Sequence, residues 1–143
     1  MTTTTLSKTE KHILDKVPDL YDDEVIKAME YAKKFYKGQH RLSGQTIYQH
    51  ALNVAKHAAN INLDTVSIIT ALLHQALYEE YDFKQNAIEI KEVFGEEVYQ
   101  LVEELHKINV AAKTKNIQSD KTLINYLTQG LPDLRIGLVK LCD

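Results

Sequence analysis

The sequence is poor in residues that break helices or form cross-links. Its 143 residues include two prolines, five glycines, one cysteine and no tryptophan. Helix breakers are few and apolar residues recur at helical spacing almost throughout, so the sequence predicts an all-α fold. The single cysteine, Cys142, cannot form a disulfide within the chain, which favours a reducing cytoplasmic location.

Long apolar runs and blocks of like charge are also missing. No apolar stretch approaches the ~20 residues that span a bilayer, and the first residues do not have the pattern of a signal peptide. The 20 acidic and 17 basic residues are well mixed along the chain. These absences argue against membrane and nucleic-acid binding and predict a soluble protein. With 44% hydrophobic residues, the chain is long enough for one compact domain.

Polar residues at regular intervals mark where helices begin. Ser7 and Glu10 fit a capping box for a first helix that runs to about Val17, before Pro18. Side chains of this kind accept hydrogen bonds from the first amides of a helix. Later helices are predicted to begin after Asp22 or Asp23, Thr46, Asp64 and Asp133.

The remaining boundaries follow from glycines and from changes in the apolar pattern. Gly38 and Gly95 are predicted to end helices, because glycine readily adopts the backbone conformation that closes them. The same pattern predicts helices over residues 47–60, 87–94, 96–108, 121–128 and 134–143, with a mobile loop over residues 109–120.

Apolar residues recur at helical spacing from Val66 to Leu77, so His74 is predicted to lie on a helix and to be buried. A buried imidazole without partners costs about 1–3 kcal/mol, so it needs hydrogen bonds or a metal. Three residues could meet it, namely His50, Gln75 and Asp143. From spacing alone, a core histidine held by a hydrogen bond is the commoner case. His57, seven residues after His50, is predicted to lie at the surface, because that spacing is too long for one metal.

The stretch over residues 38–45 has the strongest loop character in the chain. It contains two glycines and Arg41 between two predicted helices. A solvated connector and a functional loop are equally compatible with this composition.

The order of four short stretches resembles the hydrolase domain of the RelA/SpoT family. These are HD-superfamily enzymes that remove the 3′-pyrophosphate from the alarmone (p)ppGpp. The resemblance runs from about Asp23 to Asp143 and leaves residues 1–22 as an N-terminal tail and first helix. The stretches that carry it are residues 31–44, 47–55, 72–75 and 94–102, followed by residues 133–143.

The resemblance implies an HD-domain helical bundle that binds a divalent metal, usually manganese. Such an ion lowers the pKa of bound water and supplies hydroxide near neutral pH. Carried over by position, its ligands would be His50, His74, Gln75 and Asp143. A guanine nucleotide such as ppGpp would contact Arg41, Ser43 and Lys140, with Arg41 against the base.

The chain departs from the family pattern at the site itself. Gln75 stands where the family has the aspartate of the histidine–aspartate signature, so one negative charge is lost. Tyr78 and Glu79 occupy the places of an adjacent glutamate–aspartate pair that helps to position water. The acidic pair Glu79 and Glu80 stands one residue later than the family's pair. On a helix, a shift of one residue rotates the side chain by about 100° around the helix axis. The asparagine and arginine that the family has before the last helix are replaced by residues 121–124.

Three hypotheses follow from these matches and departures. The first is a catalytically impaired HD domain with a structural or regulatory role beside a synthetase domain, since an apolar helix that stops at Asp143 favours a longer natural chain. The second is a working metal-dependent phosphohydrolase in which Glu79 or Glu80 activates water. The third is a helical interaction module in which His50 and His74 are core residues.

Overall fold

A computed structural model describes residues 5–78, 82–114 and 134–142. These residues form α-helices and one short 3-10 helix, with no β-strand among them, which confirms the predicted all-α class. The elements are α1 (Lys8–Asp15), η1 (Asp19–Tyr21), α2 (Asp22–Phe35), α3 (Ile47–Asn60), α4 (Thr65–Leu73), α5 (Phe83–Phe94), α6 (Glu96–Thr114) and α8 (Leu134–Cys142).

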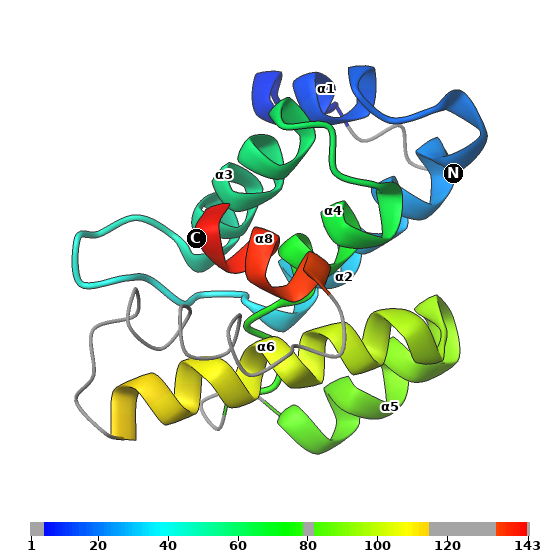
Figure 1. Cartoon of the computed structure of the whole chain (residues 1–143). Helices are drawn as coiled ribbons and strands as arrows, with labels where there is room; N and C mark the ends of the chain where they lie inside the picture. The colour runs from blue at the N-terminus through cyan, green and yellow to red at the C-terminus, as the bar shows by residue number, and fades with distance from the viewer. Residues whose placement is uncertain (1–4, 79–81, 115–133, 143) are drawn as a thin grey trace.

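Helix α4 lies at the centre of the bundle (Figure 1). Residues 67–73 are all buried, as their nearly uninterrupted apolar sequence requires. The helix packs against α2, α3, α6 and α8. Its start is fixed by Asp64, whose Oδ1 accepts a hydrogen bond from the amide of Ser67 at 2.9 Å, so the predicted cap is confirmed.

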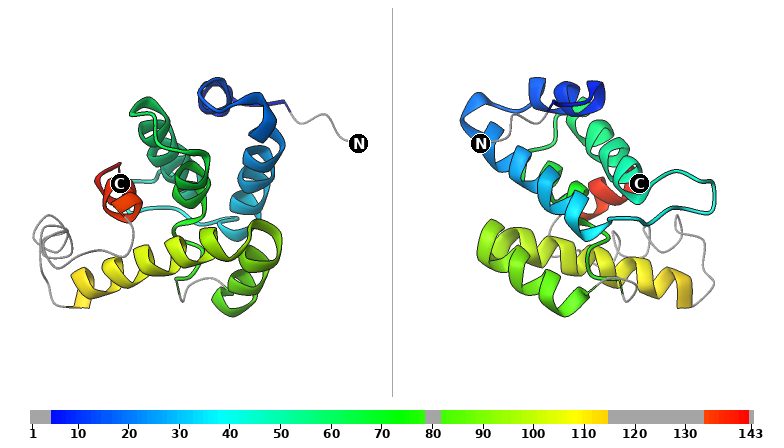
Figure 2. Two further views of the ribbon diagram at one scale, coloured as in Figure 1. Left: turned by 45° about the vertical axis from the view of Figure 1, so that its right-hand side comes forward. Right: turned by 180° about the vertical axis from the view of Figure 1, so that it is seen from behind.

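Helix α1 covers one end of the bundle, beside the end of α3 (Figure 2). Its predicted capping box is present, with the Ser7 amide donating to Glu10 at 2.8 Å and the Glu10 amide donating to Ser7 at 3.2 Å. The Glu10 carboxylate is buried and also accepts a 2.5 Å hydrogen bond from the Tyr48 hydroxyl on α3. Lys33 of α2 lies 3.2 Å from the same carboxylate, so Glu10 joins three helices.

Helix α2 begins differently from the prediction. The capping position is Tyr21, the last residue of η1, and no side chain caps the helix there. Asp22 and Asp23 lie instead inside the first turn, where their negative charges face the positive end of the helix dipole. The 3-10 turn leads straight into the helix and takes the place of a side-chain cap.

The α5 and α6 helices form a pair along the lower edge of Figure 1. Helix α5 starts at Phe83, earlier than predicted, and in its first turns the side chain of Asn86 points inward and donates to the Ala76 carbonyl at 3.0 Å. Helix α6 reaches Thr114, so the predicted loop is wrong for residues 109–114. Residues 115–120, like the helix predicted over residues 121–128, lie outside the described residues.

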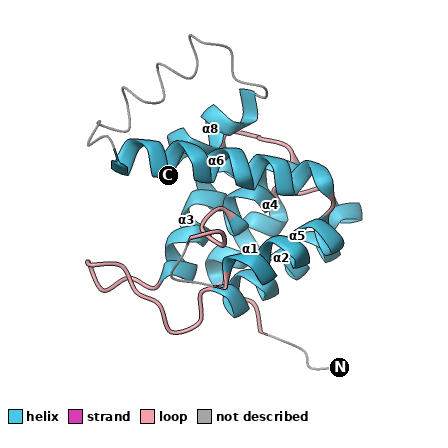
Figure 3. Ribbon diagram, turned by 90° about the horizontal axis from the view of Figure 1, so that it is seen from below, coloured by secondary structure: helices cyan, strands magenta, loops and turns pink. Residues whose placement is uncertain are grey.

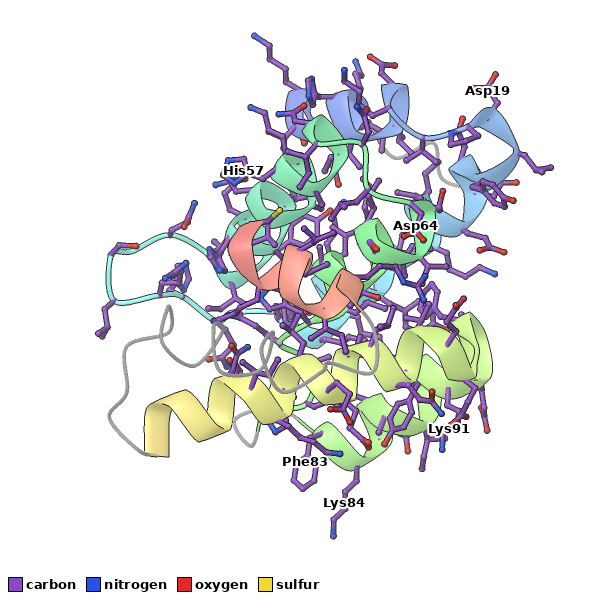
Figure 4. The ribbon with its side chains drawn as sticks, in the orientation of Figure 1. Asp19, His57, Asp64, Phe83, Lys84 and Lys91 are labelled. Atoms are coloured by element: carbon purple, nitrogen blue, oxygen red, sulfur yellow. The ribbon has the colours of Figure 1, made fainter. Side chains whose placement is uncertain are left out.

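Helix α8 closes the bundle and packs against α3, α4 and α6 (Figure 3). His57 lies on the exposed side of α3, as predicted, and its Nδ1 is 3.3 Å from the Cys142 carbonyl oxygen of α8 (Figure 4). At the other end of the molecule, Phe83 and Lys84 point outward from α5 in the same view. Across the described ranges, no helix is long and apolar enough to cross a membrane.

Candidate functional site

His50 is carried into the interior by the first turn of α3. The helix begins after Thr46, whose hydroxyl accepts a hydrogen bond from the Gln49 amide at 3.0 Å, as predicted. This start places Ala51, Val54, Ala55 and Ala58 in the core. His50 lies on the edge of that apolar face and is buried with 7% of its surface exposed.

His74 stands at the point where α4 ends, and its ring is fully buried. Its Nδ1 lies 2.6 Å from the Ala71 carbonyl oxygen, and because a carbonyl only accepts, Nδ1 must carry the hydrogen. The rings of His50 and His74 lie 5.9 Å apart, centroid to centroid, inclined at 58°. The expected meeting of the two imidazoles is therefore confirmed.

The turn after α4 is held by a residue that sequence reasoning did not select. The hydroxyl of Tyr36 donates to the Leu72 carbonyl at 2.9 Å and accepts from the Gln75 amide at 3.3 Å. The prediction that His74 lies within a helix reaching Leu77 is wrong, because α4 ends at Leu73 and residues 74–77 form a turn. The sequence signal for Tyr36 is its helical spacing from apolar residues of α2 such as Ala32, which places it on the buried side of that helix.

A pocket of about 500 Å³ opens beside this turn. One wall is the loop between α2 and α3, which projects from the bundle in Figures 1 and 3. The opposite wall is formed by the turn that follows α4. The described lining residues are Gln39, His40, Arg41, Leu42, Ser43, Ile47, Gln75 and Tyr78.

The loop wall is an irregular hairpin. The Arg41 amide donates to the Gln45 carbonyl at 2.7 Å, and the Gly44 amide donates back to the Arg41 carbonyl at 2.9 Å. The tight turn needs the positive φ of +93° at Gly44, which glycine adopts without strain. Sequence reasoning missed Gln39 and His40, although their position in the glycine-flanked loop was a signal for them.

Arg41 contacts His50 directly, Nη1 to Nδ1. A guanidinium has only N–H donors, so Nδ1 of His50 must accept and the neutral ring carries its hydrogen on Nε2. In this arrangement neither nitrogen of His50 is available as a metal ligand. His74, with its hydrogen on Nδ1, has the tautomer that suits a metal ligand.

The other predicted site residues differ in whether they line the pocket. Ser43 lines the pocket, and its hydroxyl accepts from the Gln45 amide at 3.4 Å. Lys140 is not among the described lining residues, and its Nζ donates to Asn109 of α6 at 2.7 Å. The predicted residues Glu79, Glu80 and Asp143 lie outside the described part of the chain.

The described residues alone do not form a complete site for a divalent metal ion. Within residues 5–78, 82–114 and 134–142, no group of three or more His, Cys, Asp or Glu is placed to hold one. Gln75 offers only a neutral amide, and the lone pair of His50 is engaged by Arg41. The ring of Tyr78 contacts that of His106 on α6, with centroids 5.3 Å apart and the rings inclined at 57°, and Tyr78 contributes no carboxylate.

The chain belongs to the HD domain family, whose model matches residues 28–143. Within that family its relatives are of the RelA/SpoT type. It is 38% identical over 122 residues to a guanosine-3′,5′-bis(diphosphate) 3′-pyrophosphohydrolase of Aquifex aeolicus, covering 85% of this chain and 17% of that protein. It is 34% identical over 130 residues to a GTP pyrophosphokinase of Myxococcus xanthus, covering 88% and 16%.

A third relative gives the same result. The chain is 32% identical over 133 residues to a guanosine-3′,5′-bis(diphosphate) 3′-pyrophosphohydrolase of Borreliella burgdorferi, covering 89% of this chain and 20% of that protein. The chain therefore spans a fifth or less of the length of these curated relatives.

Proposed function

We propose that this chain is a RelA/SpoT-type HD domain with impaired (p)ppGpp hydrolysis and a structural or regulatory role. The observation that carries the proposal is Gln75, which follows His74 and lines the pocket with a neutral amide. A carboxylate at this place would attract a divalent cation, whereas an amide contributes no charge. The arginine that occupies the lone pair of His50 weakens the site for a metal further.

The role beside a synthetase is supported by the names of the relatives. Some are named for synthesis, as GTP pyrophosphokinases, and others for hydrolysis, as 3′-pyrophosphohydrolases. All are several times longer than this chain. The proposal therefore has three further parts. The domain is cytoplasmic and accompanies a synthetase domain. It binds a guanine nucleotide, and it holds manganese weakly or not at all.

The test is a direct assay of pyrophosphate release from guanosine 3′,5′-bis(diphosphate) in the presence of manganese. The Aquifex aeolicus pyrophosphohydrolase serves as the positive control. We expect little or no release by this chain, and partial recovery when Gln75→Asp and Tyr78→Glu restore the two family carboxylates. Robust hydrolysis by the unmodified protein would contradict the proposal.

A working metal-dependent phosphohydrolase is the second candidate, and the pairing of His50 with His74 favours it. Glu79 or Glu80 would then activate water, with Asp143 completing the metal ligands. Metal analysis of the purified protein separates the two candidates, because near one equivalent of manganese, zinc or iron supports the enzyme. A purely helical interaction module has less support, since it would have gained support from imidazoles that lie well apart, and the two rings are 5.9 Å apart.

A further inference from the structure

The described lining of the pocket has the charge of an anion site. Arg41 is cationic at any physiological pH, and His40 is a second basic side chain beside it. The other described lining residues are uncharged, and none of them is an aspartate or glutamate. A divalent cation prefers anionic oxygen ligands, whereas phosphate oxygens prefer guanidinium and N–H donors.

The contact between Arg41 and His50 gives the cation a fixed position. Arg41 lies on an exposed loop, and an arginine there normally samples many conformations. Here its Nη1 is anchored on a buried imidazole at the base of the loop wall. Only one guanidinium nitrogen is needed for that bond, and the planar group has further N–H donors for a phosphate.

The chemistry of the opposite wall agrees with the same kind of ligand. Gln75 and Tyr78 offer an amide and a hydroxyl, and Ser43 adds a second hydroxyl from the loop. These groups hydrogen-bond phosphate oxygens without repelling them. The volume of about 500 Å³ lies within the range of pockets that hold small-molecule ligands.

From these observations we propose that the pocket binds the phosphate groups of a phosphorylated guanine nucleotide directly on Arg41, without a divalent metal. The guanidinium supplies the positive charge that a metal would otherwise bring. This inference rests on the proposed function for the identity of the nucleotide. It differs from the resemblance, which places Arg41 against the base and the phosphates near a metal.

The first experiment needs no substitution. Binding of guanosine 3′,5′-bis(diphosphate) to the 143-residue chain is measured by calorimetry in EDTA and again with added manganese. We expect the same affinity in both and a marked loss of affinity at high salt, because an exposed ionic contact is screened. Guanosine, which has the base but no phosphate, is the matched ligand and is expected to bind at least about tenfold more weakly.

The second experiment locates the contact. Arg41→Ala is expected to weaken binding by about tenfold or more, with a smaller loss for Arg41→Lys, which keeps the charge but not the planar fork. Lys37→Ala is the matched control, since Lys37 is an exposed cation near the same loop and is not a described lining residue. Circular dichroism confirms that the variants are folded.

Three results would overturn this inference: binding that requires manganese, equal affinity for guanosine, or no binding under any of these conditions. None of them bears on the hydrolysis assay, so the inference and the proposed function fail separately. A chain that neither hydrolyses nor binds the nucleotide would refute the anion site and the nucleotide-binding part of the proposed function, and would leave the impaired hydrolysis standing. A chain that hydrolyses it rapidly would refute the impaired HD domain.

Discussion

His50 on α3 and His74 at the end of α4 hold their imidazole rings 5.9 Å apart in the interior of the bundle. The two rings have opposite hydrogen placements, because His74 donates through Nδ1 to a carbonyl and His50 accepts through Nδ1 from Arg41. The two rings therefore lie close together in the interior, while His50 is also engaged by the guanidinium of Arg41.

The first prediction concerns the missing carboxylate. Gln75→Asp adds a negative charge to the wall beside His74, so manganese affinity should rise by roughly tenfold. Calorimetric titration with manganese measures the change. Gln85→Asp is the control, because Gln85 is exposed on α5 and the same charge change there should leave metal binding unaltered. An unchanged affinity in the Gln75 variant would show that the missing aspartate is not what weakens the site.

The second prediction concerns the hydroxyl of Tyr36. Tyr36→Phe removes the donor to the Leu72 carbonyl and the acceptor of the Gln75 amide, so the free energy of unfolding should fall by about 1–2 kcal/mol. Urea unfolding measures this. Tyr31→Phe deletes a hydroxyl without a hydrogen bond in the described structure and should cost much less. Similar losses in both variants would mean that the Tyr36 hydrogen bonds do not hold the turn.

Local chemistry explains which features of the fold could be predicted. Ser7, Thr46 and Asp64 cap their helices as expected, because a capping side chain bonds to amides only two or three residues away. The end of α6 could not be predicted in this way. Asn109 reads as a loop residue, yet it accepts a hydrogen bond from Lys140, a residue 31 positions later, and the helix continues past it.

In the candidate site, too, the features set by neighbouring residues could be predicted and those set by distant residues could not. The order of the motifs predicted that His50, His74, Gln75 and Arg41 lie in one region of the molecule. Each motif could be recognised because its residues are close together in the sequence. The contact of Arg41 with His50 depends on the backbone path of the hairpin, which is set by Gly44 and by the bridge between His40 and Thr46. Sequence spacing contains no information about that path, so the engaged lone pair could not be foreseen.

The third prediction concerns Arg135, which joins α8 to two other helices. Its Nη1 lies 3.0 Å from Asp64 at the start of α4, and its Nη2 lies 3.0 Å from Glu97 in the first turn of α6. Because these ion pairs are partly exposed, Arg135→Ala should cost about 1 kcal/mol of unfolding free energy, with a smaller cost at high salt. Lys107→Ala, whose ion pairs lie within α6, is the control. Equal effects in both variants would show that the link between helices contributes nothing.

The last prediction concerns the pH dependence of stability, through Glu10. Burial raises the pKa of this carboxyl, but hydrogen bonds from Tyr48, the Ser7 amide and Lys33, together with the charge of Lys33, outweigh burial and hold its pKa below the usual value. In the unfolded chain the pKa returns to about 4.3. Between the two pKa values the unfolded state therefore binds more protons than the folded state. The stabilisation is therefore complete above that pH and is lost as the pH falls through the lower, folded-state pKa.

Glu10→Gln should remove this part of the pH dependence and lower the free energy of unfolding at neutral pH by about 1–3 kcal/mol, since hydrogen bonds to a charged acceptor are replaced by weaker ones. Chemical unfolding at a series of pH values from neutral to acidic gives both quantities. Glu24→Gln is the control, because Glu24 is exposed in the first turn of α2. If wild type and Glu10→Gln lose stability in parallel as the pH falls, the Glu10 cluster does not set the acid sensitivity of the fold, and carboxylates elsewhere must.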